Sequence, residues 1–135
     1  MEHAPATEEI ERLELRTQAT TAAVAAVRRA VVAFAELHGV GVAPDVALAV
    51  SEAITNAVVH AYRDESAGPV RVVACAEPRR LVVVVRDYGC GMSPNPESPG
   101  LGLGLSVIGR LAAELNIERP DEGSGTRLRM CFTNA

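Results

Sequence analysis

Two valine-rich runs constrain the fold of this 135-residue chain more than any other feature. They span residues 70–76 and 81–87, and the short polar segment Glu77-Pro-Arg-Arg80 between them predicts a β-hairpin. Runs so rich in β-branched residues are typical of the centre of a sheet that helices cover on at least one face. A chain of this length forms one domain and can bury a proper core. The hairpin therefore predicts a central sheet with helices packed against it.

Capping and turn residues predict the other elements. One helix runs from Thr20 or Thr21 to about His38 and stops at Gly39, and a second begins at Pro44 and ends near Tyr62. We further expect an edge strand at 10–16, irregular chain at 88–104, a helix at 105–115, a short strand from Ile117 and a closing strand at 126–132. The predicted fold class is α+β, a two-layer sandwich whose mixed, mostly antiparallel sheet carries helices on one face.

The second of these helices carries three polar residues at steps of four. Glu52, Asn56 and His60 fall along one stripe of an otherwise apolar helix. A buried carboxylate without a partner is costly, so Glu52 either faces an ion, water or a substrate, or lies at the solvated edge of the helix. His60 is interpreted as a packed helix residue rather than a catalytic one.

Charge composition excludes several kinds of site. The chain has 13 arginines, no lysine and a net charge of −4. The missing lysine excludes a P-loop and the strand lysine of ordinary protein kinases, and the acidic balance argues against nucleic acid as a partner. Any phosphate must then be held by backbone N–H groups, arginine or a metal.

Cysteine usage and the N-terminus indicate a cytoplasmic protein. Cys75, Cys90 and Cys131 are widely spaced, which argues against a disulfide framework and a structural zinc site. The first residues lack the apolar core of a signal peptide, and no apolar run reaches the length of a membrane span. We expect a loose tail at 1–8 and a single domain at 9–135, with no membrane association.

Three glycine-containing segments surround the predicted helices. Asp87-Tyr-Gly-Cys-Gly-Met92 ends a buried strand, where an aspartate can accept a hydrogen bond from an exocyclic amine while glycines let a flat base approach. Gly100-Leu-Gly-Leu-Gly104 precedes a helix, whose free N–H groups favour phosphate. Gly123-Ser-Gly-Thr126 enters the last strand. Taken singly, each segment is equally explained as a turn or a flexible loop.

Taken together, the segments resemble the nucleotide-binding boxes of the Bergerat-fold (GHKL) ATPases. Glu52-Ala-Ile-Thr-Asn56 is similar to the N box, and the three glycine segments are similar to the glycine boxes in their order. The size of the chain and its last strand look most like the anti-sigma factor serine/threonine kinases of the SpoIIAB and RsbW type. The resemblance covers about residues 10 to 133.

The resemblance implies ATP and Mg²⁺ as cofactors and a role for each matched residue. Asn56 would coordinate Mg²⁺, Glu52 would act as general base or orient the attacking hydroxyl, and Asp87 would bind the adenine amino group with Thr126 close by through water. The wall of the base would be formed by Gly89, Gly91 and Met92. The phosphates would be held by a mobile lid at 93–104, which includes Gly100, Leu101, Gly102, Leu103 and Gly104.

The implied activity is that of an ATP-dependent protein serine/threonine kinase. Its substrate would be an anti-anti-sigma factor of the STAS fold, it would sequester an RNA polymerase sigma factor, and it is expected to form a homodimer. The chain has Glu97-Ser-Pro99 where some members of the family carry a basic residue. This difference motivates the alternative of a nucleotide-dependent binding module with little kinase activity. A two-component histidine kinase is disfavoured because no helical hairpin with a phospho-accepting histidine precedes the domain.

Overall fold

The computed structural model describes residues 11–61, 68–89, 101–120 and 125–134. The predicted boundary between a tail at 1–8 and the domain lies outside these residues. The elements in chain order are β1 (Glu11–Gln18), α1 (Thr21–His38), α2 (Ala43–Asn56), the π-helical turn η2 (Ala57–Ala61), β2 (Pro69–Glu77), β3 (Arg80–Asp87), α3 (Leu101–Leu111), β4 (Glu114–Glu118) and β5 (Thr126–Thr133). Apart from the π-helical turn, this is the predicted order of strands and helices.

Helix α1 begins and ends where its capping residues predict. The Thr20 side chain accepts a hydrogen bond from the backbone N–H of Ala23 at 3.2 Å, which satisfies one of the free donors of the first turn. Gly39 adopts a left-handed conformation with φ of 63° and donates its N–H to Glu36 at 3.2 Å. The buried residues of the helix recur at steps of four, which gives one apolar stripe: Ala23, Val27, Val31 and Ala35.

The five strands form one sheet in the order β1-β2-β3-β5-β4. Every neighbouring pair is antiparallel, so the parallel pair that a mixed sheet would contain is not found among the described strands. The valine run of β3 lies at the centre, as predicted. The last strand of the chain, β5, is inserted between β3 and β4.

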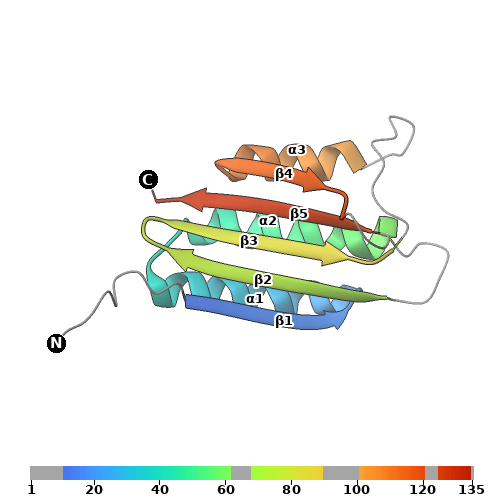
Figure 1. Cartoon of the computed structure of the whole chain (residues 1–135), viewed down its shortest axis with the longest axis horizontal. Helices are drawn as coiled ribbons and strands as arrows, with labels where there is room; N and C mark the ends of the chain where they lie inside the picture. Colours follow the sequence, from blue (N-terminus) through green and yellow to red (C-terminus); the bar gives the residue numbers. More distant parts are fainter. Residues whose placement is uncertain (1–10, 62–67, 90–100, 121–124, 135) are drawn as a thin grey trace.

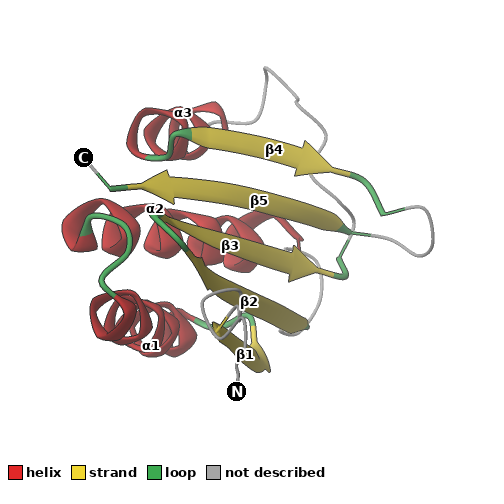
Figure 2. Cartoon of the chain, turned by 60° about the vertical axis from the view of Figure 1, so that its left-hand side comes forward, coloured by secondary structure: helices red, strands yellow, loops and turns green. Residues whose placement is uncertain are grey.

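Helices α1, α2 and α3 cover one face of this sheet (Figures 1 and 2). Alternate residues of β2, such as Val70, Val72 and Ala74, are buried against them. Helix α2 contributes fully buried side chains to the same core: Val46, Val50 and Ile54. This is the predicted two-layer sandwich. Within the described residues, each helix is too short or too polar to cross a membrane.

The third helix and the strand after it begin earlier than predicted. Helix α3 starts at Leu101 and not at Leu105, so Gly102 and Gly104 belong to its first turn. Each glycine costs a helix roughly 1 kcal/mol, but the burial of Ile108 offsets that cost. The helix ends at Leu111, because the N–H of Ala113 already bonds to Cys131 of β5 at 2.7 Å and starts the pairing of β4.

The sequence predicts a regular helix as far as Tyr62, but α2 is regular over only part of this range. Its α-helical part ends at Asn56, and residues 57–61 form a π-helical turn. A π-helical turn contains one extra residue. The regular four-residue spacing that relates Glu52 to Asn56 therefore ends with the α-helical part at Asn56. Turns of this kind often occur beside functional sites, because they displace the backbone without breaking the helix.

Candidate functional site

The elements that carry the described predicted residues meet at one end of the molecule. The end of β3, the start of β5, the end of α2 with η2, and the start of α3 all lie there (Figure 1). Antiparallel pairing places Asp87 directly opposite Thr126 on the helix-covered side of the sheet. The candidate site is defined here by five described residues: Glu52, Asn56, Asp87, Gly89 and Thr126.

Asp87 is a buried carboxylate at the end of the central strand. Only 3% of its surface is exposed, and its Oδ1 accepts a hydrogen bond from the N–H of Gly89 at 3.1 Å. Burial raises the pKa of Asp87, while backbone N–H groups of Gly89 and Thr126 and the charge of Arg86 lower it to a smaller extent. Burying a carboxylate in this way is unfavourable for folding alone. This residue type and position suit recognition of a donor such as an exocyclic amine.

The residue before Thr126 holds this arrangement together and was missing from the predicted site residues. Gly125 has a φ of 102°, and a Cβ atom there would lie 2.0 Å from the carbonyl oxygen of Asp87. Only glycine therefore lets the start of β5 lie so close to the end of β3. The Gly-Ser-Gly-Thr pattern predicts a turn. The clash between a Cβ atom at Gly125 and the Asp87 carbonyl depends on the distance between β5 and β3, which the sequence does not give.

Asn56 is the second buried polar residue of the site. It is the last residue of α2, its exposed fraction is 4%, and its Nδ2 makes no hydrogen bond within the described part of the chain. An unsatisfied buried amide costs about 1–3 kcal/mol, and such groups in native proteins call for an explanation. A bound ligand that offers an acceptor, such as a phosphate oxygen, would supply one.

Glu52 lies one helical turn before Asn56 in α2. It is half-buried, and no other described residue forms a hydrogen bond or ion pair with it. The solvated edge of the helix, one of the two alternatives drawn from the sequence, agrees with this position. Part of the residue is exposed to solvent.

The remaining predicted residues divide into two groups. Gly91, Met92 and Gly100 lie outside the described residues. The backbone of 101–104 forms the first turn of α3, at the same end of the molecule as the end of β3 (Figure 1). The first four N–H groups of a helix have no partner within it, so this turn can donate to an anion.

Two hollows in the described structure lie outside the candidate site. One, of about 320 Å³, is lined by the start of α2 and the end of α3, including Asp45 and Arg110. The other, of about 250 Å³, is lined by Arg16, Arg71 and Tyr88 together with Pro69 and Val70. Arg110 lies in the last turn of α3, at the opposite end of this helix from residues 101–104.

Comparison with known proteins identifies the family of the chain. Residues 17–132 match the family described as histidine kinase-like ATPase domain, and the chain belongs to that family. Membership implies nucleotide binding. The anti-sigma F factor of Clostridium kluyveri is 35% identical over 97 residues, which are 64% of this chain and 67% of the relative. The anti-sigma F factors of Clostridium acetobutylicum and Pasteuria penetrans are 34% and 33% identical, over 64% of this chain and 66% and 65% of the relatives. Within the family, the chain is of the SpoIIAB type, as the resemblance implied.

Proposed function

We propose that this protein is a cytoplasmic anti-sigma factor that binds ATP and acts as a protein serine/threonine kinase. Its substrate is an anti-anti-sigma factor of the STAS fold, and it sequesters an RNA polymerase sigma factor when that substrate is unavailable. One observation carries the proposal: a buried carboxylate, Asp87, and an unpartnered buried amide, Asn56, lie at the same end of a histidine kinase-like ATPase domain. The names of the curated relatives support the regulatory part.

In this proposal, Asp87 selects the base. Its carboxylate accepts a hydrogen bond from the amino group of adenine, and the hydroxyl of Thr126 takes part through a water molecule. Gly89 lies two residues beyond Asp87 and leaves room for the flat ring beside the backbone. Gly91 and Met92 are proposed to complete the wall of the base.

Asn56 and the start of α3 bind the phosphates. The Asn56 amide fits Mg²⁺, because this ion prefers oxygen ligands and takes few of them from the protein when phosphates and water supply the rest. When bound, the ion neutralises the charge of the phosphates. The N–H groups of residues 101–104 donate to phosphate oxygens, and Gly100 is proposed to let the chain approach them closely.

Glu52 receives the proton in the transfer step. The hydroxyl oxygen of a serine or threonine of the substrate attacks the γ-phosphorus, the bond to the β–γ bridging oxygen breaks, and ADP leaves. The proton of the hydroxyl passes to the Glu52 carboxylate. The partly exposed position of Glu52 on α2 fits a protein substrate that approaches from outside.

Calorimetric titration of ATP, with and without Mg²⁺, tests the site. We expect micromolar binding by the wild type, loss of binding in Asp87→Asn, and loss of the Mg²⁺ dependence in Asn56→Ala. Absence of ATP binding by the folded wild-type protein would refute the proposal. Phosphate transfer to the cognate STAS partner is then measured with the wild type and Glu52→Gln, in which transfer should fall by at least 10²-fold.

A second candidate function is favoured by the state of Glu52. No hydrogen bond from another described residue orients its carboxylate, which is what a nucleotide-dependent binding module with little kinase activity would show. Glu52→Ala separates the two candidates. A pure binding module keeps sigma factor regulation and ATP binding in this variant and has no transfer activity to lose.

Association into a homodimer belongs to the same proposal. Sedimentation of the pure protein at several concentrations, with and without ATP, measures it directly. A monomer under all conditions would remove the dimer from the proposal and leave the nucleotide site untouched.

A further inference from the structure

The face of the sheet that the helices leave open has an unusual charge pattern. Cross-strand pairing places four arginines directly opposite one another on successive strands. They are Arg16 on β1, Arg71 on β2, Arg86 on β3 and Arg127 on β5. Like charges directly opposite each other destabilise a sheet, so this arginine row is unfavourable for folding alone.

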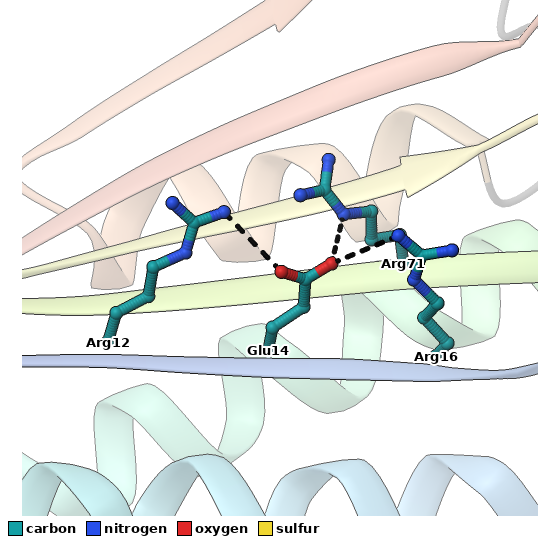
Figure 3. Close-up of polar contacts among 4 residues, drawn as sticks. All are labelled: Arg12, Glu14, Arg16 and Arg71. Carbon is teal, nitrogen blue, oxygen red and sulfur yellow. Dashed lines mark hydrogen bonds and ion pairs between the residues drawn. The ribbon is translucent and has the colours of Figure 1, made fainter.

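Several groups contact the row: Arg86 donates to the Asp87 carbonyl at 3.1 Å and lies over the Tyr88 ring, and two glutamates pair with the other arginines. Glu14 accepts from Arg71 Nε at 2.6 Å, from Arg16 Nη2 at 3.4 Å and from Arg12 Nη2 at 3.5 Å, so one carboxylate faces three guanidinium groups (Figure 3). The hydrogen bond from Arg71 is the main reason why the pKa of Glu14 is lowered. At the other end of the row, Arg127 pairs with Glu118 at 3.2 Å.

Within the described strands, the open face carries more arginines than acids, although the chain is acidic. Alternation along the strands places seven arginines and four glutamates on it, while the net charge of the chain is −4. The arginines are Arg12, Arg16, Arg71, Arg80, Arg86, Arg127 and Arg129, and the glutamates are Glu14, Glu77, Glu114 and Glu118. Arg129 is half-buried and has no ion pair within the described residues.

An apolar band lies beside the arginine row. One step along the strands, Val73 of β2 is opposite Val84 of β3, and one step further Cys75 is opposite Val82. Val73, Val84 and Cys75 are only half-buried, because no helix covers this face. At the end of the row, the hollow of about 250 Å³ beside Tyr88 has apolar walls and two arginines. A matching ligand therefore presents apolar groups flanked on one side by negative charge.

From this arrangement we propose that the open face binds an amphipathic helix of a protein partner, with the acidic flank of that helix on the arginine row and on Arg129, which lies one step along β5 from Arg127. Neighbouring strands are about 4.8 Å apart, and successive turns of an α-helix are about 5.4 Å apart. A helix that lies across the strands thus places carboxylates at steps of three or four residues close to successive arginines. Its apolar stripe rests on the valine band.

Two other occupants fit the face less well. Nucleic acid would place phosphates against the four glutamates as well as the arginines. A second copy of this chain, packed face to face, would bring two positive surfaces together, and juxtaposed like charges oppose association. The acidic helix avoids both conflicts. The inference does not depend on ATP, because this face lies on the other side of the sheet from the Asp87 side chain.

Fluorescence anisotropy with a labelled synthetic peptide tests the inference on the full chain. The probe is a helix of about 18 residues with leucines along one stripe and glutamates along its flank, and the control probe has glutamine for every glutamate. We expect the acidic probe to bind and its affinity to fall steeply with salt. In Arg71→Gln/Arg129→Gln the affinity should fall at least tenfold.

The matched control is Arg29→Gln/Arg110→Gln, which removes the same charge from exposed positions on α1 and α3. This variant should bind the acidic probe like the wild type, and both variants should titrate ATP like the wild type. Arg129→Gln alone repeats the test with the least disturbance of the fold, since its guanidinium has no described ion pair to lose.

Several results would overturn the inference. The first is equal affinity of the wild type for both probes, and the second is an equal loss of affinity for the acidic probe in the two double variants. The third is tighter binding of a DNA or RNA duplex than of the acidic probe. The fourth is self-association of the wild type that is lost in Arg71→Gln/Arg129→Gln. Loss of ATP binding in every protein would instead count against the proposed function and leave the open face as it stands.

Discussion

At the scale of single residues, the buried carboxylate of Asp87 lowers the stability of the fold but suits the binding of a hydrogen-bond donor. Its carboxylate is buried at the end of β3, and burial is the main cause of its raised pKa. A group whose pKa is raised in the folded state binds its proton more tightly there than in the unfolded chain. Its contribution to the free energy of unfolding is therefore full at low pH and is lost as the pH rises through its folded-state pKa.

This gives a prediction for Asp87→Asn, in which the titrating group is absent. The free energy of unfolding of the wild type, relative to the variant, should fall as the pH rises from the ordinary aspartate range toward neutrality. Urea denaturation of both proteins at a series of pH values measures the difference. A difference that stays constant or grows with pH would contradict the assignment of a raised pKa to Asp87.

Gly125 provides a second prediction at this scale. Gly125→Ala places a Cβ atom against the Asp87 carbonyl and forces an alanine to a φ of 102°, so the free energy of unfolding should fall by roughly 2 kcal/mol or more. Gly109→Ala is the matched control, because Gly109 lies in α3 with nothing within 4 Å of the added atom. The control should gain about 0.5–1 kcal/mol. Equal effects in the two variants would show that the close approach of β5 to β3 is not a constraint.

At the scale of elements, local capping residues determine where some helices begin and end, and long-range packing determines it for others. Helix α1 is defined at its start by the Thr20 side chain. Thr20→Ala should lower the free energy of unfolding by about 1 kcal/mol, since the N–H of Ala23 loses its acceptor. Thr21→Ala, which leaves the cap in place, should change it by less than half of that. Thermal and urea unfolding of both variants test this.

The difference between local capping and long-range packing explains which ends of the elements can be predicted from the sequence. The bounds of α1 were predicted because Thr20 and Gly39 act locally. The start of α3 was not predicted, because its glycines are unfavourable for a helix and long-range packing of Leu105, Ile108 and Leu111 on the core compensates them. The π-helical turn after Asn56 leaves no sequence pattern that we recognise. Within the candidate site, Asp87 and Asn56 were found from motif resemblance, whereas Gly125 required the distance between two strands.

At the scale of the whole molecule, nucleotide binding and folding are linked. A ligand that binds only the folded protein stabilises it by about 2.7 kcal/mol at a concentration 100 times its Kd. We therefore expect ATP with Mg²⁺ to raise the Tm of the wild type by several degrees and to leave the Tm of Asp87→Asn unchanged. Differential scanning fluorimetry measures both, and guanosine triphosphate serves as the control for the base. A similar rise with either nucleotide would contradict base selection by Asp87.

The strand order has one consequence for the folding of the sheet. Of the described strands, β5 comes last in the sequence, yet it lies between β3 and β4 and carries Thr126. Just beyond it, Asn134 bonds back to the connection between α1 and α2, accepting from Gly41 at 2.7 Å and donating to Gly39 at 3.2 Å. Until β5 has paired with β3, that edge of β3 is open and Asp87 lacks its cross-strand neighbour Thr126. Pairing of β5 therefore completes the sheet and brings the two buried polar residues together in a single step.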